Sequence, residues 1–144
     1  MKLSFLRSTA LLAFLFVSGG AVADAGENKA SSVMTTDSGL KYQDLEVGDG
    51  EEAMIGDKVE VHYTGWLATG VKFDSSLDRG QSFEFKLGSG VVIKGWDEGI
   101  VGMRVGHKRK LMVPNHLAYG KRGILDLVPP GADLVFEIEV LKIR

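Results

Sequence analysis

The sequence contains no cysteine, which excludes disulfide bonds, thiolate metal sites, thiol nucleophiles and a lipid-modified cysteine. Proline is scarce, with three residues, whereas glycine is abundant, with 19. Such a composition is unlike that of a proline-rich linker, and it predicts many tight turns in place of long helices. These absences favour a β-rich protein whose chemistry does not depend on sulfur.

Neither sign of charge dominates the chain. Lysine and arginine number 17 and aspartate and glutamate 19, for a formal net charge of −2. No long run of like charges is present, so we expect no nucleic-acid partner. The local basic stretch 106–110 (GHKRK) is interpreted as a solvated strand edge kept charged against aggregation, with contact to an acidic partner as the alternative.

The longest apolar run, residues 10–17, is too short to span a membrane, which takes about 20 apolar residues. It follows Lys2 and Arg7 and precedes Ala21-Val22-Ala23, the order of a secretory signal peptide. We therefore predict a signal peptide over residues 1–23, cut after Ala23 or alternatively Ala25. The protein is then exported, into the periplasm if the source is Gram-negative or otherwise secreted, with no stable membrane insertion after cleavage.

The remaining chain is long enough for one domain. Residues 24–38 are small and polar and predict a flexible leader, followed by a folded domain over residues 39–144. Alternating apolar and polar residues predict strands over 58–64, 82–87 and 134–143, with a bulge or burial on both faces near Leu141. Trp96, Ile100 and Met103 predict a short helix over 95–103. The fold class is α+β, a curved antiparallel β-sheet of about five strands wrapped around one short α-helix.

Familiar catalytic and cofactor motifs are missing. The three histidines are isolated from other metal ligands, so no metal site is predicted. Ser89 stands between glycines but lacks the nucleophile-elbow pattern, and neither a phosphate-binding loop nor a dinucleotide fingerprint occurs. We accordingly expect no cofactor.

With these motifs absent, the candidate functional residues are aromatic residues that lie in specific local sequences. Each aromatic side chain by itself is equally consistent with filling a core. They lie in six segments: VHYTG (61–65), KFDSS (72–76), FEFKLG (83–88), VIKGWDEG (92–99), LAYG (117–120) and VPPGADLVF (128–136). In their order and spacing these segments closely resemble the FKBP-type peptidyl-prolyl cis-trans isomerases, with an opening at Ser38–Tyr42 like that of bacterial members.

The resemblance implies an apolar cavity between sheet and helix. Trp96 would form its floor, Asp74 would be a carboxylate at the rim, and the Tyr119 hydroxyl and the Ile93 backbone N–H would donate hydrogen bonds to substrate. An alternative for Asp74 is that it merely caps the turn at Ser75-Ser76. Phe85 and Leu87 are assigned to the core. The walls would be formed by Tyr63, Phe73, Phe83, Val92, Ile93, Tyr119 and Phe136.

The loop over residues 121–128 departs most from the family. Many members have histidine in place of Ile124 and Pro-Gly in place of Leu125-Asp126, so substrate preference and macrolide affinity are expected to differ here. Ile124, Leu127 and Val128 are predicted to form an apolar lip that binds substrate, with packing of the loop onto the sheet as the alternative.

The resemblance implies an isomerase acting on X-Pro bonds of exported or unfolded proteins and binding macrolides such as tacrolimus or rapamycin. Dimerising bacterial relatives use a long helical N-terminal extension, which is lacking here, so we expect a monomer. Two alternatives use the same groove: a binding module that grips apolar segments without catalysis, and an extracellular factor acting on a host protein.

Overall fold

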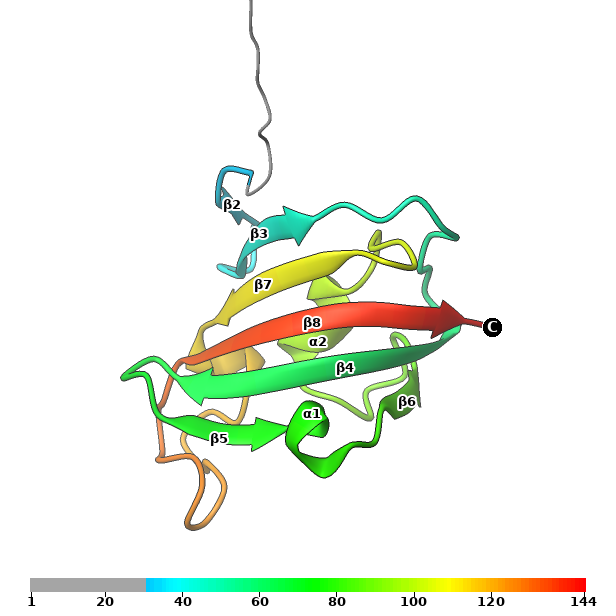
Figure 1. Ribbon diagram of the computed structural model, residues 1–144. Coiled ribbons are helices and arrows are strands. Elements are labelled where there is room, and N and C mark those ends of the chain that lie inside the picture. The colour runs from blue at the N-terminus through cyan, green and yellow to red at the C-terminus, as the bar shows by residue number, and fades with distance from the viewer. Residues whose placement is uncertain (1–30) are drawn as a thin grey trace, which may run out of the picture. The chain divides into compact units, whose positions relative to one another are not determined.

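One antiparallel sheet organises residues 31–144, the part of the chain that the computed structural model describes (Figure 1). In this part the sheet has seven strands, and their order is β2-β3-β7-β8-β4-β5, with β6 also paired to β4. The strands are β2 (Met34–Thr35), β3 (Lys41–Glu46), β4 (Lys58–Leu67), β5 (Lys72–Ser75), β6 (Phe83–Lys86), β7 (Lys108–Val113) and β8 (Leu134–Ile143).

The prediction of about five strands was therefore too low. The two four-residue strands β5 and β6 both pair with the ten-residue β4, at different parts of its length. Strand β2 has two residues and pairs with β3. The alternation over 82–87 did predict β6, whereas β2 and β5 contain too few alternating residues to be recognised in the sequence.

The N-terminal predictions fall mostly outside the described residues. The predicted signal peptide, 1–23, and the first part of the predicted leader, 24–38, lie outside residues 31–144. The end of that leader is not free of structure, however, because β2 lies within it and pairs with β3. Ser38 also donates a hydrogen bond to Glu98 at 2.7 Å. Among residues 31–144, no helix combines the length and apolar character that a membrane crossing requires.

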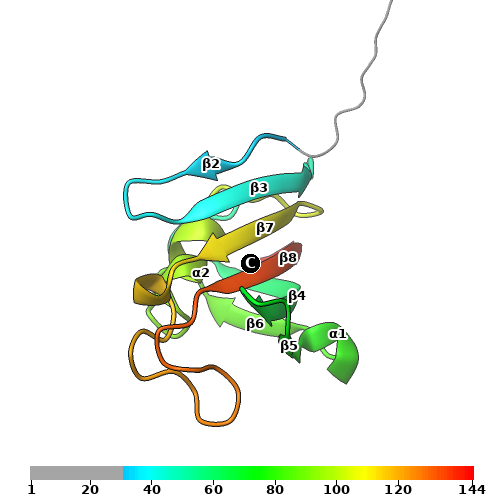
Figure 2. The same ribbon diagram turned by 90° about the vertical axis from the view of Figure 1, so that its left-hand side faces the viewer.

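The helix that packs against the sheet is α2 (Lys94–Gly99), shorter than the predicted 95–103. Figure 2 shows it against one face, which we call the inner face. Gly95 and Gly99 make this packing possible, since a Cβ atom at Gly95 would lie 2.5 Å from Val113 and one at Gly99 would lie 2.8 Å from Leu111. Two further short turns, α1 (Ser76–Arg79) and the 3₁₀ turn η3 (Asn115–Leu117), were not predicted. The α+β class is confirmed.

The strand periodicity predicted the core correctly. Val59, Val61 and Tyr63 of β4 are buried on the inner face, and Phe85 and Leu87 are buried as predicted. The expected bulge in β8 is confirmed as well: Glu60 pairs with Lys142 whereas Val61 pairs with Val140, which leaves Leu141 as the extra residue.

The basic stretch 106–110 does not form a strand edge, contrary to the prediction. Its last three residues begin β7, which lies between β3 and β8. Two of its side chains are buried, His107 at 4% and Arg109 at 8% exposure. Arg109 Nε and His107 Nε2 both donate to Asp44 Oδ1, at 2.6 and 2.8 Å, and Arg109 Nη1 donates to the Gly99 carbonyl at the end of α2. The sequence could not reveal this cluster because Asp44 is remote from it in the chain.

Asp44 should make stability sensitive to acid. Burial alone would raise its pKa, but the hydrogen bonds from Arg109 and His107 outweigh this and lower the pKa below its ordinary 3.8. Because the pKa is lower in the folded state, this stabilisation is present above the unfolded-state pKa and is lost as the pH falls through the folded-state value. Asp44→Asn should lose about 1–3 kcal/mol of unfolding free energy at pH 7 and less at pH 3, which lies below the ordinary pKa of 3.8.

Urea unfolding at the two pH values measures this difference. Asp49→Asn is the matched control, because Asp49 is exposed and should change stability little at either pH. An equal loss for Asp44→Asn at pH 7 and pH 3 would contradict the proposed role of the carboxylate charge.

Candidate functional site

An open cavity of about 170 Å³ lies between the inner face, α2 and the segment that precedes α2. Nine of the twelve residues predicted for the site line it. The lining residues are Tyr63, Phe73, Asp74, Phe83, Val91, Val92, Ile93, Trp96, Tyr119 and Phe136. They come from strands β4, β5, β6 and β8, from α2 and from two loops, and only Val91 was not predicted. Val91 directly precedes Val92-Ile93, and this adjacency was the one signal that could have found it.

Trp96 of α2 lies among the aromatic side chains of this cavity and is 5% exposed. Its ring packs edge-on against Tyr63 and Phe136, with centroid distances of 4.9 and 5.3 Å, and also against Phe83 at 6.2 Å. Edge-to-face packing of this kind is favourable because the positive ring edge meets the negative face. The indole Nε1 is buried and has no hydrogen-bond partner among the described residues.

Gly65 allows two of the aromatic walls to approach β4. A Cβ atom at this position would lie 2.7 Å from Phe136 and 2.9 Å from Phe73. These distances are too short for any side chain, so both rings pack directly over the backbone of the strand. The cavity wall at this point therefore depends on the absence of a side chain.

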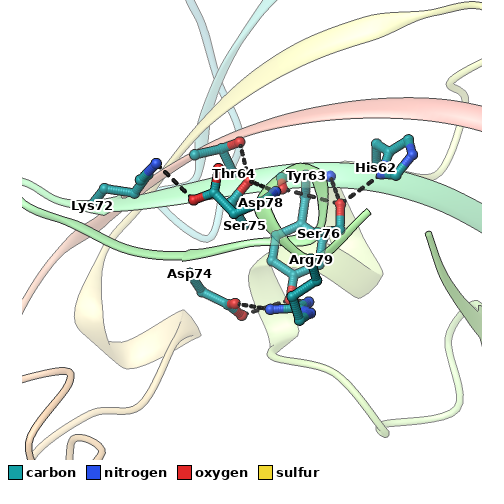
Figure 3. Close-up of polar contacts among 9 residues, drawn as sticks. All are labelled: His62, Tyr63, Thr64, Lys72, Asp74, Ser75, Ser76, Asp78 and Arg79. Carbon is teal, nitrogen blue, oxygen red and sulfur yellow. Dashed lines mark hydrogen bonds and ion pairs between the residues drawn. The ribbon is translucent and has the colours of Figure 1, made fainter. Parts of the chain in front are cut away.

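The polar rim of the cavity consists of a hydrogen-bonded network between Asp74, Tyr63 and Arg79 (Figure 3). The Tyr63 hydroxyl donates to Asp74 Oδ2 at 2.6 Å and accepts from Arg79 Nη2 at 2.9 Å. Arg79 Nη1 donates to Asp74 Oδ1. The sequence analysis missed Arg79, because no sequence pattern connects it with Asp74. The turn of α1 brings the Arg79 side chain back to Asp74 of β5.

This network shifts the pKa values of Asp74 and Tyr63. Burial alone would raise the pKa of Asp74, but the hydrogen bonds from Tyr63 and Arg79 outweigh it and lower the pKa. Burial raises the pKa of Tyr63, and the hydrogen bond to Asp74 raises it further. Near neutral pH the rim therefore holds a carboxylate, a guanidinium and a neutral phenol.

Asp74 does not merely cap the following turn, although its carboxylate also accepts a hydrogen bond from the Ser75 backbone. The side chain of Ser75 performs that function, since Ser75 is the N-cap of α1 and its oxygen accepts from the Asp78 N–H at 3.4 Å. Ser76 is fully buried, and its Oγ accepts from the Tyr63 N–H at 2.8 Å. These two serines hold α1 against β4 and leave the Asp74 carboxylate free to face Tyr63 and Arg79.

Ile93 occupies the N-cap position of α2 with an extended backbone. Its carbonyl accepts hydrogen bonds from the N–H groups of Trp96 and Asp97, at 3.0 and 3.2 Å. No group within residues 31–144 accepts from its own N–H. Ile93 lines the cavity, and its backbone N–H is therefore available to donate a hydrogen bond to a ligand.

Asp97 holds the segment before α2 in place. Its two carboxylate oxygens accept from the Gly88 N–H at 2.8 Å and the Gly90 N–H at 3.0 Å. The carboxylate also lies in the first turn of α2, where negative charge is favourable. Sequence reasoning missed this positioning role, although a carboxylate shortly after a Gly-Ser-Gly turn was a usable signal.

Tyr119 contributes a half-buried ring and a hydroxyl group to the cavity. The hydroxyl has no hydrogen-bond partner among the described residues. Burial raises its pKa, and the negative charge of Asp74 raises it further. The hydroxyl therefore remains protonated at neutral pH and can donate to a ligand.

Ile124, Leu127 and Val128 do not line this cavity. They line a separate depression of about 320 Å³ together with Leu67, Arg122 and the two prolines at 129–130. Val128 is 3% exposed and packs in the core, and it exchanges backbone hydrogen bonds with Ile124 at 2.8 Å. For Val128 the alternative interpretation, packing of the loop, is therefore the better one.

The described residues offer no group of three or more metal-binding side chains. The cavity is an apolar aromatic enclosure with hydrogen-bond donors from Ile93 and Tyr119 and a charged rim at Asp74. An enclosure of this kind can hold an apolar ring and orient the carbonyl groups beside it.

Comparison with known proteins gives consistent matches over the region that contains the cavity. The family model of the FKBP-type peptidyl-prolyl cis-trans isomerases matches residues 49–141. The FK506-binding protein of Neisseria meningitidis serogroup B is 54% identical over 105 residues, which cover 73% of this chain and 96% of the relative. Peptidyl-prolyl cis-trans isomerase FPR2 of Saccharomyces cerevisiae is 56% identical over 94 residues, 65% of this chain and 70% of the relative.

A solved structure agrees in fold. The crystal structure of FkpA from Escherichia coli matches with a TM-score of 0.72 and 43% identity, over 78% of this chain and 51% of that chain. All ten cavity-lining residues lie within the range matched by the family model.

Proposed function

The chain belongs to the FKBP-type peptidyl-prolyl cis-trans isomerases, and on that premise we propose that it catalyses rotation about X-Pro bonds by stabilising the twisted amide in the aromatic cavity. The isomerase activity follows from the family. The mechanism and the assignment of residues are our proposal, and the observation that supports them is the convergence of nine predicted residues on one cavity with free hydrogen-bond donors.

Rotation about an X-Pro bond requires the loss of amide conjugation, a barrier of about 18–20 kcal/mol. No covalent bond to carbon is made or broken, so a catalyst needs neither nucleophile nor metal but must bind the twisted amide more tightly than the planar one. An apolar enclosure favours the twisted form because the planar amide has more charge separation and loses more hydration on entering it.

The residues take distinct roles in this proposal. The proline ring lies on Trp96, between the walls formed by Tyr63, Phe73, Phe83, Val92 and Phe136. The Ile93 N–H and the Tyr119 hydroxyl donate to carbonyl groups that flank the proline, which holds one side of the bond while the other rotates. Asp74 fixes the ring of Tyr63 through the hydroxyl hydrogen bond. Ile124 and Leu127 contact the substrate chain beyond the proline.

The Tyr119 hydroxyl gives a direct test of the donor role. Tyr119→Phe should reduce kcat/KM for a Leu-Pro or Phe-Pro peptide by about two- to tenfold, because one hydrogen bond worth about 0.5–1.5 kcal/mol is removed. Tyr42→Phe is the matched control, since Tyr42 lies beside Arg109 and outside the cavity. An unchanged rate for Tyr119→Phe would exclude the hydroxyl as a donor in the transition state.

The same isomerase assay tests whether macrolides bind in the cavity. Tacrolimus or rapamycin should bind in the cavity and abolish catalysis by the full chain. Tight macrolide binding without any acceleration of isomerisation would instead favour the non-catalytic binding module.

We further propose that the substrates are exported or unfolded proteins and that the chain acts as a monomer in the periplasm or outside the cell. The support for export is the signal-peptide pattern of residues 1–23, which lie outside the described residues. Cell fractionation with detection of a new N-terminus near residue 24 tests this; recovery of the uncut chain in the cytoplasm would contradict it.

A further inference from the structure

The outer face of the sheet is the one turned away from α2 (Figure 1), and it carries one apolar row. Strand pairing aligns five residues across five neighbouring strands, and we call them the Trp66 row: Lys41, Met112, Val135, Trp66 and Lys72. The three central side chains are all partly exposed. The adjacent row is polar throughout, with Gln43, Lys110, Glu137, Thr64 and Ser75. The Trp66 row is thus an apolar stripe with a lysine at each end.

Two surface depressions meet on this row and share Ala68 and Val135. One has a volume of about 390 Å³ and extends over Met112 towards Lys41. The other has a volume of about 250 Å³ and extends over Trp66 towards Lys110. The apolar stripe is therefore hollowed on both sides of Val135, which suits a ligand that places side chains into two neighbouring depressions.

The row carries a lysine at each end and an indole N–H near its centre. Lys41 forms no ion pair within residues 31–144, and the Trp66 indole N–H has no partner there. Lys72 pairs with Asp78 at 2.7 Å, but both side chains are exposed, so a ligand carboxylate can compete for this lysine.

Two acidic groups also line the depressions. Asp133 already accepts hydrogen bonds from the backbone N–H and the side-chain amide of Asn115, and Glu137 lies opposite Lys110 in the strand register. The groups that remain for a ligand are therefore the Lys41 and Lys72 ammonium groups and the indole N–H, which favour carboxylates.

We propose that the Trp66 row binds an extended acidic segment of a partner protein. Four steps between strands of about 4.8 Å separate Lys41 from Lys72, a span of about 19 Å that an extended chain covers in about six residues. The segment that fits has acidic side chains about six positions apart, with apolar or aromatic side chains between them. Binding here leaves the cavity on the inner face open, so the partner needs no proline and does not compete with a substrate.

Isothermal titration calorimetry of the full chain with a synthetic, proline-free peptide tests the proposal. The peptide carries two aspartates six positions apart, with leucine and phenylalanine between them. Its binding should weaken at least about tenfold in Trp66→Ser, because a central tryptophan dominates such contacts. Lys41→Ala should weaken binding by about threefold, and added salt should weaken it in the unaltered protein.

Glu139→Gln is the matched control, because Glu139 lies on the same face of β8 but pairs with His62 and Lys108, outside the Trp66 row. Its affinity for the peptide should be unchanged. The isomerase rate of Trp66→Ser should also be unchanged, which shows that the variant is folded. A peptide with lysines in place of the aspartates should not bind.

Three results would overturn the proposal: no binding of the acidic peptide, equal binding to Trp66→Ser, or equal binding of the lysine peptide. Sedimentation of the full chain provides a separate check. Self-association that Trp66→Ser abolishes would show that a second copy of the chain, and not an acidic partner, covers this row.

Discussion

Replacement of Trp96 by alanine should destabilise the protein by about 3–5 kcal/mol, the range for loss of a large aromatic side chain from a core. Trp96 is 5% exposed and packs against Tyr63, Phe83, Phe85 and Phe136. Its removal leaves a void next to an existing cavity, and the backbone cannot collapse into it while α2 is held by Asp97 and Arg109. Chemical denaturation monitored by circular dichroism measures the loss.

Phe83→Ala is the matched control for this substitution. Phe83 is an aromatic wall of the same cavity but is 37% exposed, so we expect a loss of only about 1 kcal/mol. Equal losses for the two variants would contradict the view that Trp96 is both the floor of the cavity and part of the core. Both variants should lose isomerase activity, because each removes part of the surface that holds the proline ring.

Replacement of Asp74 by alanine should lower kcat/KM by about tenfold or more, which corresponds to about 1.4 kcal/mol of transition-state stabilisation. The carboxylate accepts from the Tyr63 hydroxyl at 2.6 Å and pairs with Arg79. Without it, the ring of Tyr63 is no longer fixed from the rim, and Arg79 loses its ion-pair partner at the cavity. A protease-coupled or NMR exchange assay with a Phe-Pro peptide measures the rate.

Asp78→Ala controls for the general loss of a carboxylate near α1. Asp78 pairs with Lys72 on the outer face, and its side chain is 60% exposed. We expect activity and stability close to those of the unaltered protein, since exposed ion pairs contribute little. If Asp74→Ala also retained full activity, the rim network would have a structural role only, and the proposed role of Asp74 in holding the cavity wall would be wrong.

The predictions that succeeded rest on local patterns. Alternation along β4 indicated which of its residues are buried, and the phase change in β8 indicated the bulge at Leu141. The six family-like segments indicated nine of the ten residues that line the cavity. These features are visible in a sequence because side-chain direction follows the strand period of two, and because close backbone approaches such as that at Gly65 permit only one residue type.

The predictions that failed concern contacts between distant parts of the chain. Arg109 looked solvated because it stands among basic residues, yet it is buried against Asp44 and the end of α2. Val128 looked suited to a cavity lip, yet it packs in the core and the loop forms a separate depression. In both cases the local sequence is compatible with either environment, and only the neighbouring elements decide between them.

The sequence by itself thus determined the α+β class, the alternation of the main strands and most of the side chains of the cavity. The tertiary structure alone decided that Arg79 and Asp97 complete the site, that Asp74 bonds to Tyr63 and Arg79, and that the Trp66 row exists. The physical reason is that periodicity and turn propensity act over a few residues, whereas strand register and helix packing bring together groups that are distant in the chain.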